Sequence, residues 1–208
     1  MTVHTDAVIQ RLEGDGRIQR VVFNDGRVID TDLLIPALGS TMNRDILRGT
    51  PIAAENAILV DECCRTNVPG TFAAGDCAAI FDPAFGKHCI REHWESARAT
   101  GEIAGTNMAG GSTALASVNS FSTTVFDLPV SVWGEARFVD HRLMRGPVNG
   151  DVQFVEFGIA SDGRLAQVIA VGETAHGSLL RDMVTRRMRT EGIEEQLKDP
   201  DFDLNELK

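Results

Sequence analysis

The sequence PGTFAAGDCAAIFD, residues 69–82, decides the fold that we predict for this chain. Its apolar run at residues 71–74 is typical of a buried strand, and the run ends at Gly75 and Asp76. A carboxylate in that place lies at the carboxyl edge of a sheet, where open α/β sheets bind their ligands. Gly75 would let the backbone approach a ligand, Asp76 would accept hydrogen bonds from sugar hydroxyls, and the amides of a following helix would face a phosphate. The alternative is a simple turn in which Asp76 caps that helix.

The segment before this stretch predicts an antiparallel meander. Short apolar runs alternate with turns at residues 13–16 and 24–26. Asn-Asp-Gly between apolar runs is a strong hairpin signal, because these residues tolerate positive φ. Residues 33–38 are continuously apolar, as expected of a buried strand. Residues 3–39 should therefore form short strands that lead into a sheet.

The segment after it predicts a helix and then a second group of strands. Apolar residues recur near a 3.6-residue period from Ile90 onward, and Gly110 provides a stop, so we expect a helix that begins at Ile90. An amphipathic helix is expected over residues 178–188, and the acidic tail, residues 198–208, is expected to fray. The strands between these two helices are expected at residues 124–126, 130–133, 152–157 and 165–171, with a hairpin turn at 161–164.

The composition excludes several classes of function. The net charge of −10 argues against nucleic acid or an anionic membrane as the main partner. No apolar stretch approaches the ~20 residues of a membrane span, and the first residues show no secretion signal, so we expect a cytoplasmic protein. The four cysteines lack C-x-x-C spacing and are expected to be reduced thiols, and the histidine spacing predicts no metal site. The arginines between residues 181 and 189 are interpreted as a solvated helix face.

Four stretches resemble one enzyme superfamily. Residues 65–78 resemble the second flavin-binding signature of the pyridine nucleotide–disulfide oxidoreductases, and residues 26–39 are similar to the exit from their NAD-binding domain. Residues 91–110 resemble the ferredoxin/rubredoxin reductase and apoptosis-inducing-factor branch. Residues 122–136 are closer to the interface domain of the NADH oxidase and coenzyme A-disulfide reductase branch. The resemblance is therefore to the superfamily and not to a single branch.

The resemblance implies an α/β fold in three parts. Residues 1–50 would be the distal part of an NAD(P)-binding domain, and residues 51–114 the C-terminal part of an FAD-binding domain. Residues 115–208 would form an interface domain for dimerisation, with an antiparallel sheet and helices. The first flavin fingerprint of the superfamily, G-x-G-x-x-G, has no counterpart, because the nearest string, residues 14–19, ends in Gln and lies in a predicted hairpin. The chain thus resembles the C-terminal half of such a flavoprotein.

The resemblance also assigns cofactor-binding residues. Gly75 and Asp76 would contact the ribityl or pyrophosphate-proximal part of FAD. Glu92, His93 and Trp94 would start a helix beside the flavin and nicotinamide rings, where the helix N-terminus stabilises negative charge on reduced flavin.

Phe126 would approach the cofactor from the interface domain. Other interpretations stay open, namely core packing for Phe126 and Trp94 and an exposed helix start for Glu92. No residue of the chain is assigned a catalytic role.

The resemblance implies that the complete protein is an FAD-dependent NAD(P)H oxidoreductase. Electrons would pass from nicotinamide through flavin to an acceptor, which could be a protein. The chain alone is expected to bind FAD weakly or not at all and to be inactive. Its partner would be a second copy or a chain that carries the missing N-terminal half. The alternative is a non-catalytic dimerisation module or one half of a split flavoenzyme.

Overall fold

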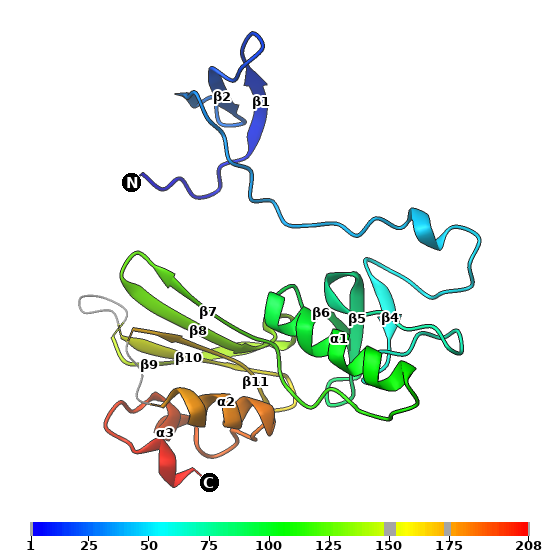
Figure 1. The fold of residues 1–208 in the computed structure, drawn as a ribbon. Helices are drawn as coiled ribbons and strands as arrows, with labels where there is room; N and C mark the ends of the chain where they lie inside the picture. The colour runs from blue at the N-terminus through cyan, green and yellow to red at the C-terminus, as the bar shows by residue number, and fades with distance from the viewer. Residues whose placement is uncertain (1, 148–152, 173–175, 208) are drawn as a thin grey trace. The chain divides into compact units, whose positions relative to one another are not determined.

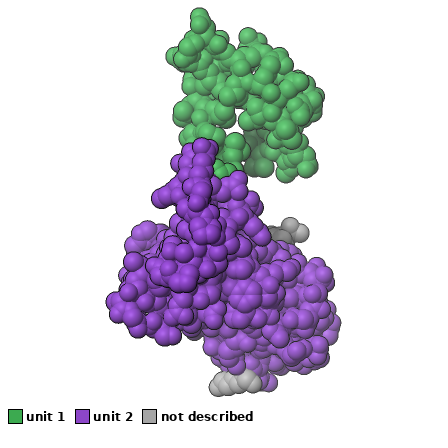
Figure 2. All heavy atoms as spheres, turned by 90° about the vertical axis from the view of Figure 1, so that its right-hand side faces the viewer, with its two compact units in different colours: residues 1–41 green, residues 42–208 purple. Residues whose placement is uncertain are grey.

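The computed structural model describes residues 2–147, 153–172 and 176–207. The chain divides into two compact units, residues 1–41 and 42–208 (Figure 1, Figure 2). Each unit is described by itself. Strands and helices together give the α/β fold class that the sequence predicts.

The first unit is a three-stranded antiparallel meander in the order β1-β2-β3. Val21 and Val22 of the central strand are buried, at 4% and 5% exposure. Gly26 closes the second hairpin with φ +86°, as the Asn-Asp-Gly signal predicts. The meander prediction is therefore confirmed. The strands are β1 (Ile9–Glu13), β2 (Arg20–Phe23) and β3 (Val28–Asp30).

The apolar segment at residues 33–38 is not a strand, so that prediction was wrong. Leu33, Ile35 and Leu38 are 70%, 77% and 90% exposed. A strand needs a neighbour that accepts and donates its backbone hydrogen bonds, and the only sheet in this described unit ends at β3. Apolar sequence alone therefore did not produce a buried element here.

The second unit begins with a small mixed sheet in the order β4-β5-β6. Strand β4 (Ile58–Val60) pairs in parallel with β5 (Ala78–Asp82), and β5 pairs antiparallel with β6 (Lys87–Ile90). Helix α1 (Trp94–Met108) lies alongside this sheet (Figure 1). A short 3-10 helix, η1 (Asp45–Leu47), precedes β4.

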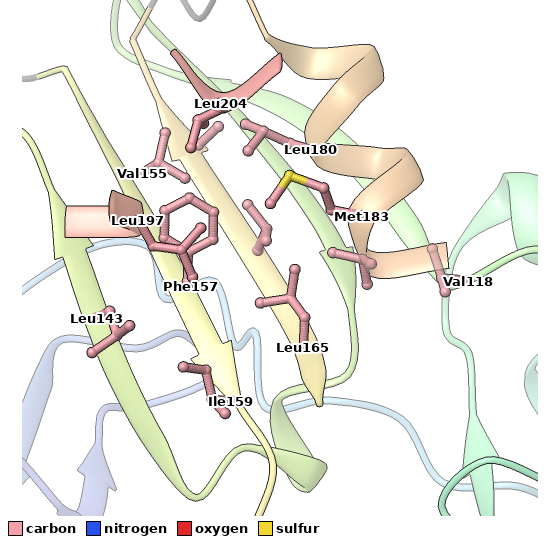
Figure 3. Packing of buried hydrophobic residues seen from close by; sticks show 13 residues of the cluster. Val118, Leu143, Val155, Phe157, Ile159, Leu165, Leu180, Met183, Leu197 and Leu204 are labelled. Carbon is pink, nitrogen blue, oxygen red and sulfur yellow. The ribbon is translucent and has the colours of Figure 1, made fainter. Parts of the chain in front are cut away.

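A five-stranded antiparallel sheet in the order β7-β8-β11-β10-β9 forms the rest of the unit. Its core is packed between the sheet and the helices α2 and α3, and contains the fully buried Phe157 and Leu165 of the sheet and Leu180 of α2 (Figure 3). The strands predicted at 130–133 and 165–171 and the turn at Gly163 are confirmed. The strand predicted at 124–126 ends at Val125, because Phe126 lies in the following turn. The strand predicted at 152–157 begins at Phe154, and residue 152 lies outside the described residues. The elements are β7 (Ser120–Val125), β8 (Leu128–Gly134), η3 (Ala136–Phe138), β9 (His141–Arg145), β10 (Phe154–Ile159), β11 (Leu165–Val171), α2 (Gly177–Thr185), α3 (Glu194–Lys198) and η4 (Leu204–Glu206).

Two boundaries around the opening motif differ from the prediction. Residues 71–74 form no strand and contribute one isolated bridge, between Arg65 and Phe72. The motif's strand is β5, which follows Asp76 instead of preceding it. The helix begins at Trp94 and not at Ile90, because Ile90 pairs with Ala79 in the sheet. Strand pairing within the β5–β6 hairpin thus overrode the helical period.

The C-terminal tail is docked, which corrects the expectation that it frays. Leu204 is completely buried in the main core. Arg145 of β9 donates hydrogen bonds to the backbone carbonyls of Pro200 and Phe202, at 3.1 and 2.7 Å, and also to that of Asp199. The tail is thus fixed by its apolar side chains, Leu204 together with the partly buried Phe202 and Leu207, and by one buried guanidinium.

Within the described ranges, no helix has both the length and the apolar character needed to cross a bilayer.

We predict that Leu204→Ala lowers the free energy of unfolding by about 2–5 kcal/mol, because it leaves a cavity in a closed core. Urea denaturation measures this change. Ile46→Ala in the same unit is the control, since Ile46 is 82% exposed and its truncation should change stability by less than about 0.5 kcal/mol. Equal stability of Leu204→Ala and the unmodified chain would show that the tail is not part of the core.

Candidate functional site

The turn at Gly75 is fixed to helix α1 by a buried hydrogen bond. The Gly75 amide donates to the Thr100 hydroxyl at 3.0 Å, and that hydroxyl donates to the Ser96 carbonyl at 2.8 Å. Thr100 is 1% exposed. Gly75 has φ +74°, a conformation that strains any residue with a side chain. These two features place the turn against the first half of α1.

Asp76 lies exposed on the 3-10 turn η2 (Gly75–Cys77). Among the described residues, none forms a hydrogen bond or ion pair with its carboxylate. Because β5 follows the turn directly, Asp76 caps no helix, and no helix amides follow it to face a phosphate. Both of those expectations were wrong. What remains of the predicted site here is an exposed acceptor held beside α1.

The start of α1 presents an aromatic, exposed surface. Trp94 is 75% exposed, so core packing of its side chain was the wrong alternative. The Arg98 guanidinium lies 5.8 Å from the centre of the Trp94 ring. His93 precedes the helix without capping it, and its ring packs against that of Phe121 of β7 with 4.5 Å between the centroids and an angle of 34° between the ring planes. Glu92 is exposed next to it.

The helix N-terminus at Trp94 can favour negative charge. Its first amides lack intrahelical acceptors, and the 15-residue helix has a dipole with its positive end there. Gly75 is bonded to α1 through Thr100, and His93 and Trp94 lie at the start of the same helix. That these residues bind a flavin stays a prediction.

Phe126 stands apart from this group. It occupies the turn between β7 and β8 with φ +55° and is 74% exposed, so core packing was wrong for this residue too. Along the hairpin it lies five residues beyond Phe121, roughly 16 Å at the rise of a strand. The structure therefore does not bring Phe126 to the start of α1, and its contact with a cofactor stays a prediction.

A group of buried charges was missed by the sequence interpretation. Asp82 and Arg91 are 4% and 7% exposed. Arg187 forms an ion pair with Asp82 and lies 4.8 Å from the Phe85 ring centre, so it does not belong to a solvated helix face. Asp82 closes the opening motif and Arg91 directly follows β6. The sequence signal that could have identified Asp82 and Arg91 is their position at the ends of apolar strand segments.

All four cysteines are free thiols. Burial is the main cause that raises the pKa of Cys64 to about 11 and that of Cys89 to about 12. A protonated buried thiol is a poor nucleophile. We therefore interpret these two thiols as small apolar packing groups. In the part of the chain that the structure describes, no group of three His, Cys, Asp or Glu side chains is arranged to hold a metal ion.

Comparison with known proteins gives one consistent family. Residues 1–101 match the pyridine nucleotide-disulphide oxidoreductase family. The ferredoxin–NAD(+) reductase component of the anthranilate 1,2-dioxygenase system from Burkholderia cepacia is 28% identical over 185 residues, covering 86% of this chain and 44% of that protein. Apoptosis-inducing factor 3 from Mus musculus is 30% identical over 161 residues, covering 76% of this chain and 26% of that protein.

Comparison with solved structures also finds a ferredoxin reductase. The ferredoxin reductase for the CYP199A2 system from Rhodopseudomonas palustris superposes with a TM-score of 0.83 at 23% identity, covering 98% of this chain and 50% of that one. The chain spans half or less of the length of the relatives that it matches.

We predict that Gly75→Ala destabilises the chain by about 1–2 kcal/mol, because alanine is strained at positive φ. The added methyl would meet Ala97 at 3.6 Å, an ordinary contact, so strain and not a clash sets the cost. Gly101→Ala is the matched control and should stabilise by about 0.5–1 kcal/mol, because Gly101 lies within α1 with open space around it. Thermal unfolding measures both changes in stability. If Gly75→Ala and Gly101→Ala shifted the stability in the same direction, this account of the turn would be contradicted.

We predict that Cys77 reacts with a thiol reagent much faster than Cys64 and Cys89 near neutral pH. Cys77 is partly exposed, whereas the raised pKa values keep the other two thiols protonated until the pH approaches 11 to 12. Cys77→Ser should remove the fast phase, and Cys89→Ser should keep it. A fast reaction that persists in Cys77→Ser would contradict the assignment.

Proposed function

Because the chain belongs to the pyridine nucleotide-disulphide oxidoreductase family, we propose that the complete protein is an FAD-dependent NAD(P)H oxidoreductase. These 208 residues would supply the second group of flavin contacts and the interface domain. The domain limits 1–50, 51–114 and 115–208 belong to this proposal. So do a cytoplasmic location and a dimeric state.

One observation carries the flavin assignment. The exposed Asp76 carboxylate has no protein partner in the described structure, and the bond between Gly75 and Thr100 holds it beside α1. An acceptor in that place suits the hydroxyls of a ribityl chain, and the exposed Trp94 ring suits contact with a planar ring system. His93 and Glu92 flank the helix start, where negative charge is favoured. FAD itself would supply the redox chemistry, and these residues would hold and orient it.

The chain alone should bind FAD weakly or not at all. Its only G-x-G string, at residues 14–16, lies in the turn between β1 and β2 and not between a strand and a helix. It therefore cannot cradle a pyrophosphate in the manner of a dinucleotide fingerprint. The electron acceptor proposed for the complete protein is a small ferredoxin-like protein, in keeping with the name of the Burkholderia cepacia relative.

A second candidate function is that of an interaction module. The exposed apolar side chains of Leu33, Ile35 and Leu38 favour it, since apolar surface of this kind marks sites of association. The module would pair with a second copy or with a polypeptide that carries the G-x-G-x-x-G half. It would then act by completing a split flavoenzyme or by dimerisation alone.

The proposal predicts that Asp76→Ala weakens FAD binding by about 10–100-fold in a polypeptide that joins this chain to a G-x-G-x-x-G half encoded upstream or nearby. This range follows from losing hydrogen bonds to a charged acceptor, at about 1.5–3 kcal/mol. FAD content per chain and NAD(P)H-dependent dye reduction are the measurements. Asp45→Ala is the control, because Asp45 is also exposed on a 3-10 turn. Full flavin content in Asp76→Ala would contradict the role of this residue.

Two simple measurements separate the candidates. Purified alone, the 208-residue chain should be colourless and should gain no flavin absorbance after incubation with FAD and gel filtration. A yellow chain with one FAD per polypeptide would overturn the expectation of weak binding. A monomer in gel filtration, with no reading frame nearby for the missing half, would count against the interaction module.

A further inference from the structure

A cavity with two arginines in its lining lies where the end of β5, residues 115–118 and the C-terminal end of α2 meet. It has a volume of about 170 Å³ and is lined by Asp82, Arg91, Ser117 and Arg187 among others. A cavity of this size has room for several waters or for one small ion, since a water occupies ~30 Å³ in the liquid. A second cavity of about 120 Å³ shares Arg91 and Ser117 with it and adds Arg181.

Arg91 has an unused donor in this region. Its Nη1 donates to the Ser117 carbonyl at 2.7 Å, but its Nε has no hydrogen-bond partner among the described residues. The residue is 7% exposed, so bulk water does not reach most of it. A buried N–H of a charged group without a partner costs free energy, and structures rarely leave one unpaired.

Arg187, which lines the same cavity, has a second unused donor. One of its nitrogens pairs with Asp82, and Nη1 has no partner among the described residues. Arg187 has φ +51° at the C-terminal end of α2, in the left-handed position that usually holds glycine. Its amide donates to the Val184 carbonyl and the Met188 amide to the Met183 carbonyl, as in a Schellman motif. The strain is retained at a position whose side chain reaches the buried Asp82.

The charges around the cavity do not cancel. Asp82 is its only acidic lining residue, and the carboxylate is already engaged by Arg187 and by the amides of Ala84 and Phe85. Glu135, the other buried carboxylate near Arg91, lines neither cavity; its Oε2 lies 3.5 Å from Arg137, and its Oε1 has no hydrogen-bond partner among the described residues. Two guanidinium groups therefore face the larger cavity against one occupied carboxylate, in a chain whose net charge is −10.

We propose that this cavity binds a small oxyanion, of the phosphate or carboxylate class, through the Nε of Arg91 and the Nη1 of Arg187. Guanidinium groups suit such ligands because their planar donors match oxyanion geometry. The anion would accept hydrogen bonds from the two unpaired guanidinium nitrogens. It would thereby connect the ends of β5 and β6 to the C-terminal end of α2. The proposal does not depend on the flavin assignment, because it uses none of the residues proposed to hold FAD.

Inorganic phosphate is the probe for the test on the full 208-residue chain. Phosphate should raise the melting midpoint saturably relative to chloride at equal ionic strength, by about 5–10 °C at ~100 times the dissociation constant. Isothermal titration calorimetry should show one site. No saturable rise and no heat of binding would overturn the proposal.

Matched variants separate this site from general salt effects. Arg91→Gln should abolish the phosphate response, whereas Arg98→Gln, the same change at an arginine with 64% side-chain exposure on α1, should keep it. Ser117→Asp places a carboxylate at the cavity without removing a buried charge. Because the new carboxylate would take the place of the anion, Ser117→Asp should raise the melting midpoint in chloride and remove the response to phosphate. Ser112→Asp, outside the cavity, should change neither the midpoint nor the response. If Arg91→Gln fails to fold, the serine pair decides, and an unchanged phosphate response in Ser117→Asp overturns the proposal.

Discussion

The hydrogen bonds that α1 makes through its buried face hold the first part of the second unit together. That face consists of Thr100, Ala104 and Asn107, one helical stripe of two polar residues and one small one. Thr100 accepts from the Gly75 amide, and the Asn107 side chain donates to the carbonyls of Cys63 and Thr113 at 2.9 and 2.8 Å. Three separate loops thus end on one helix. A buried polar group without a hydrogen-bond partner costs free energy. The hydrogen bonds to Thr100 and Asn107 therefore restrict the conformation of each of these loops.

Local sequence predicted those parts of the fold that depend on neighbours in the chain. The hairpin at Gly26, the turn at Gly163 and helix α2 follow from turn residues and short-range periodicity, and the structure has all three. Residues 33–38 and 71–74 were predicted as strands because they are apolar, but a strand also needs a partner. Ile90 fits a helical period, yet it pairs with Ala79 of β5. That pairing belongs to the β5–β6 hairpin, and the apolar periodicity of residues 90–108 does not reveal it.

The candidate site was predicted in its residues but not in its construction. Gly75 and Asp76 are where a turn meets α1, although the turn precedes its strand instead of following one. Exposure of Trp94 and Phe126 could not be read from the sequence, since a large aromatic residue is more often buried than not. The buried charges were missed for the opposite reason. Arg145 and Arg187 resemble surface residues in sequence, and only long-range contacts with the tail and with Asp82 bury them.

The geometry of the turn at Gly75 supports the proposed site more than Asp76 does by itself. An exposed, unpaired aspartate costs a protein nothing, because water solvates its carboxylate, so Asp76 alone carries little weight. The positive φ of Gly75 is different, since it restricts that position to glycine and is maintained by a bond to a hydroxyl that is 1% exposed. No apolar side chain is buried by this turn, because η2 contributes none to the core. At the surface, this geometry places the Asp76 carboxylate beside α1. A ligand with hydroxyl groups would donate hydrogen bonds to a carboxylate in that place.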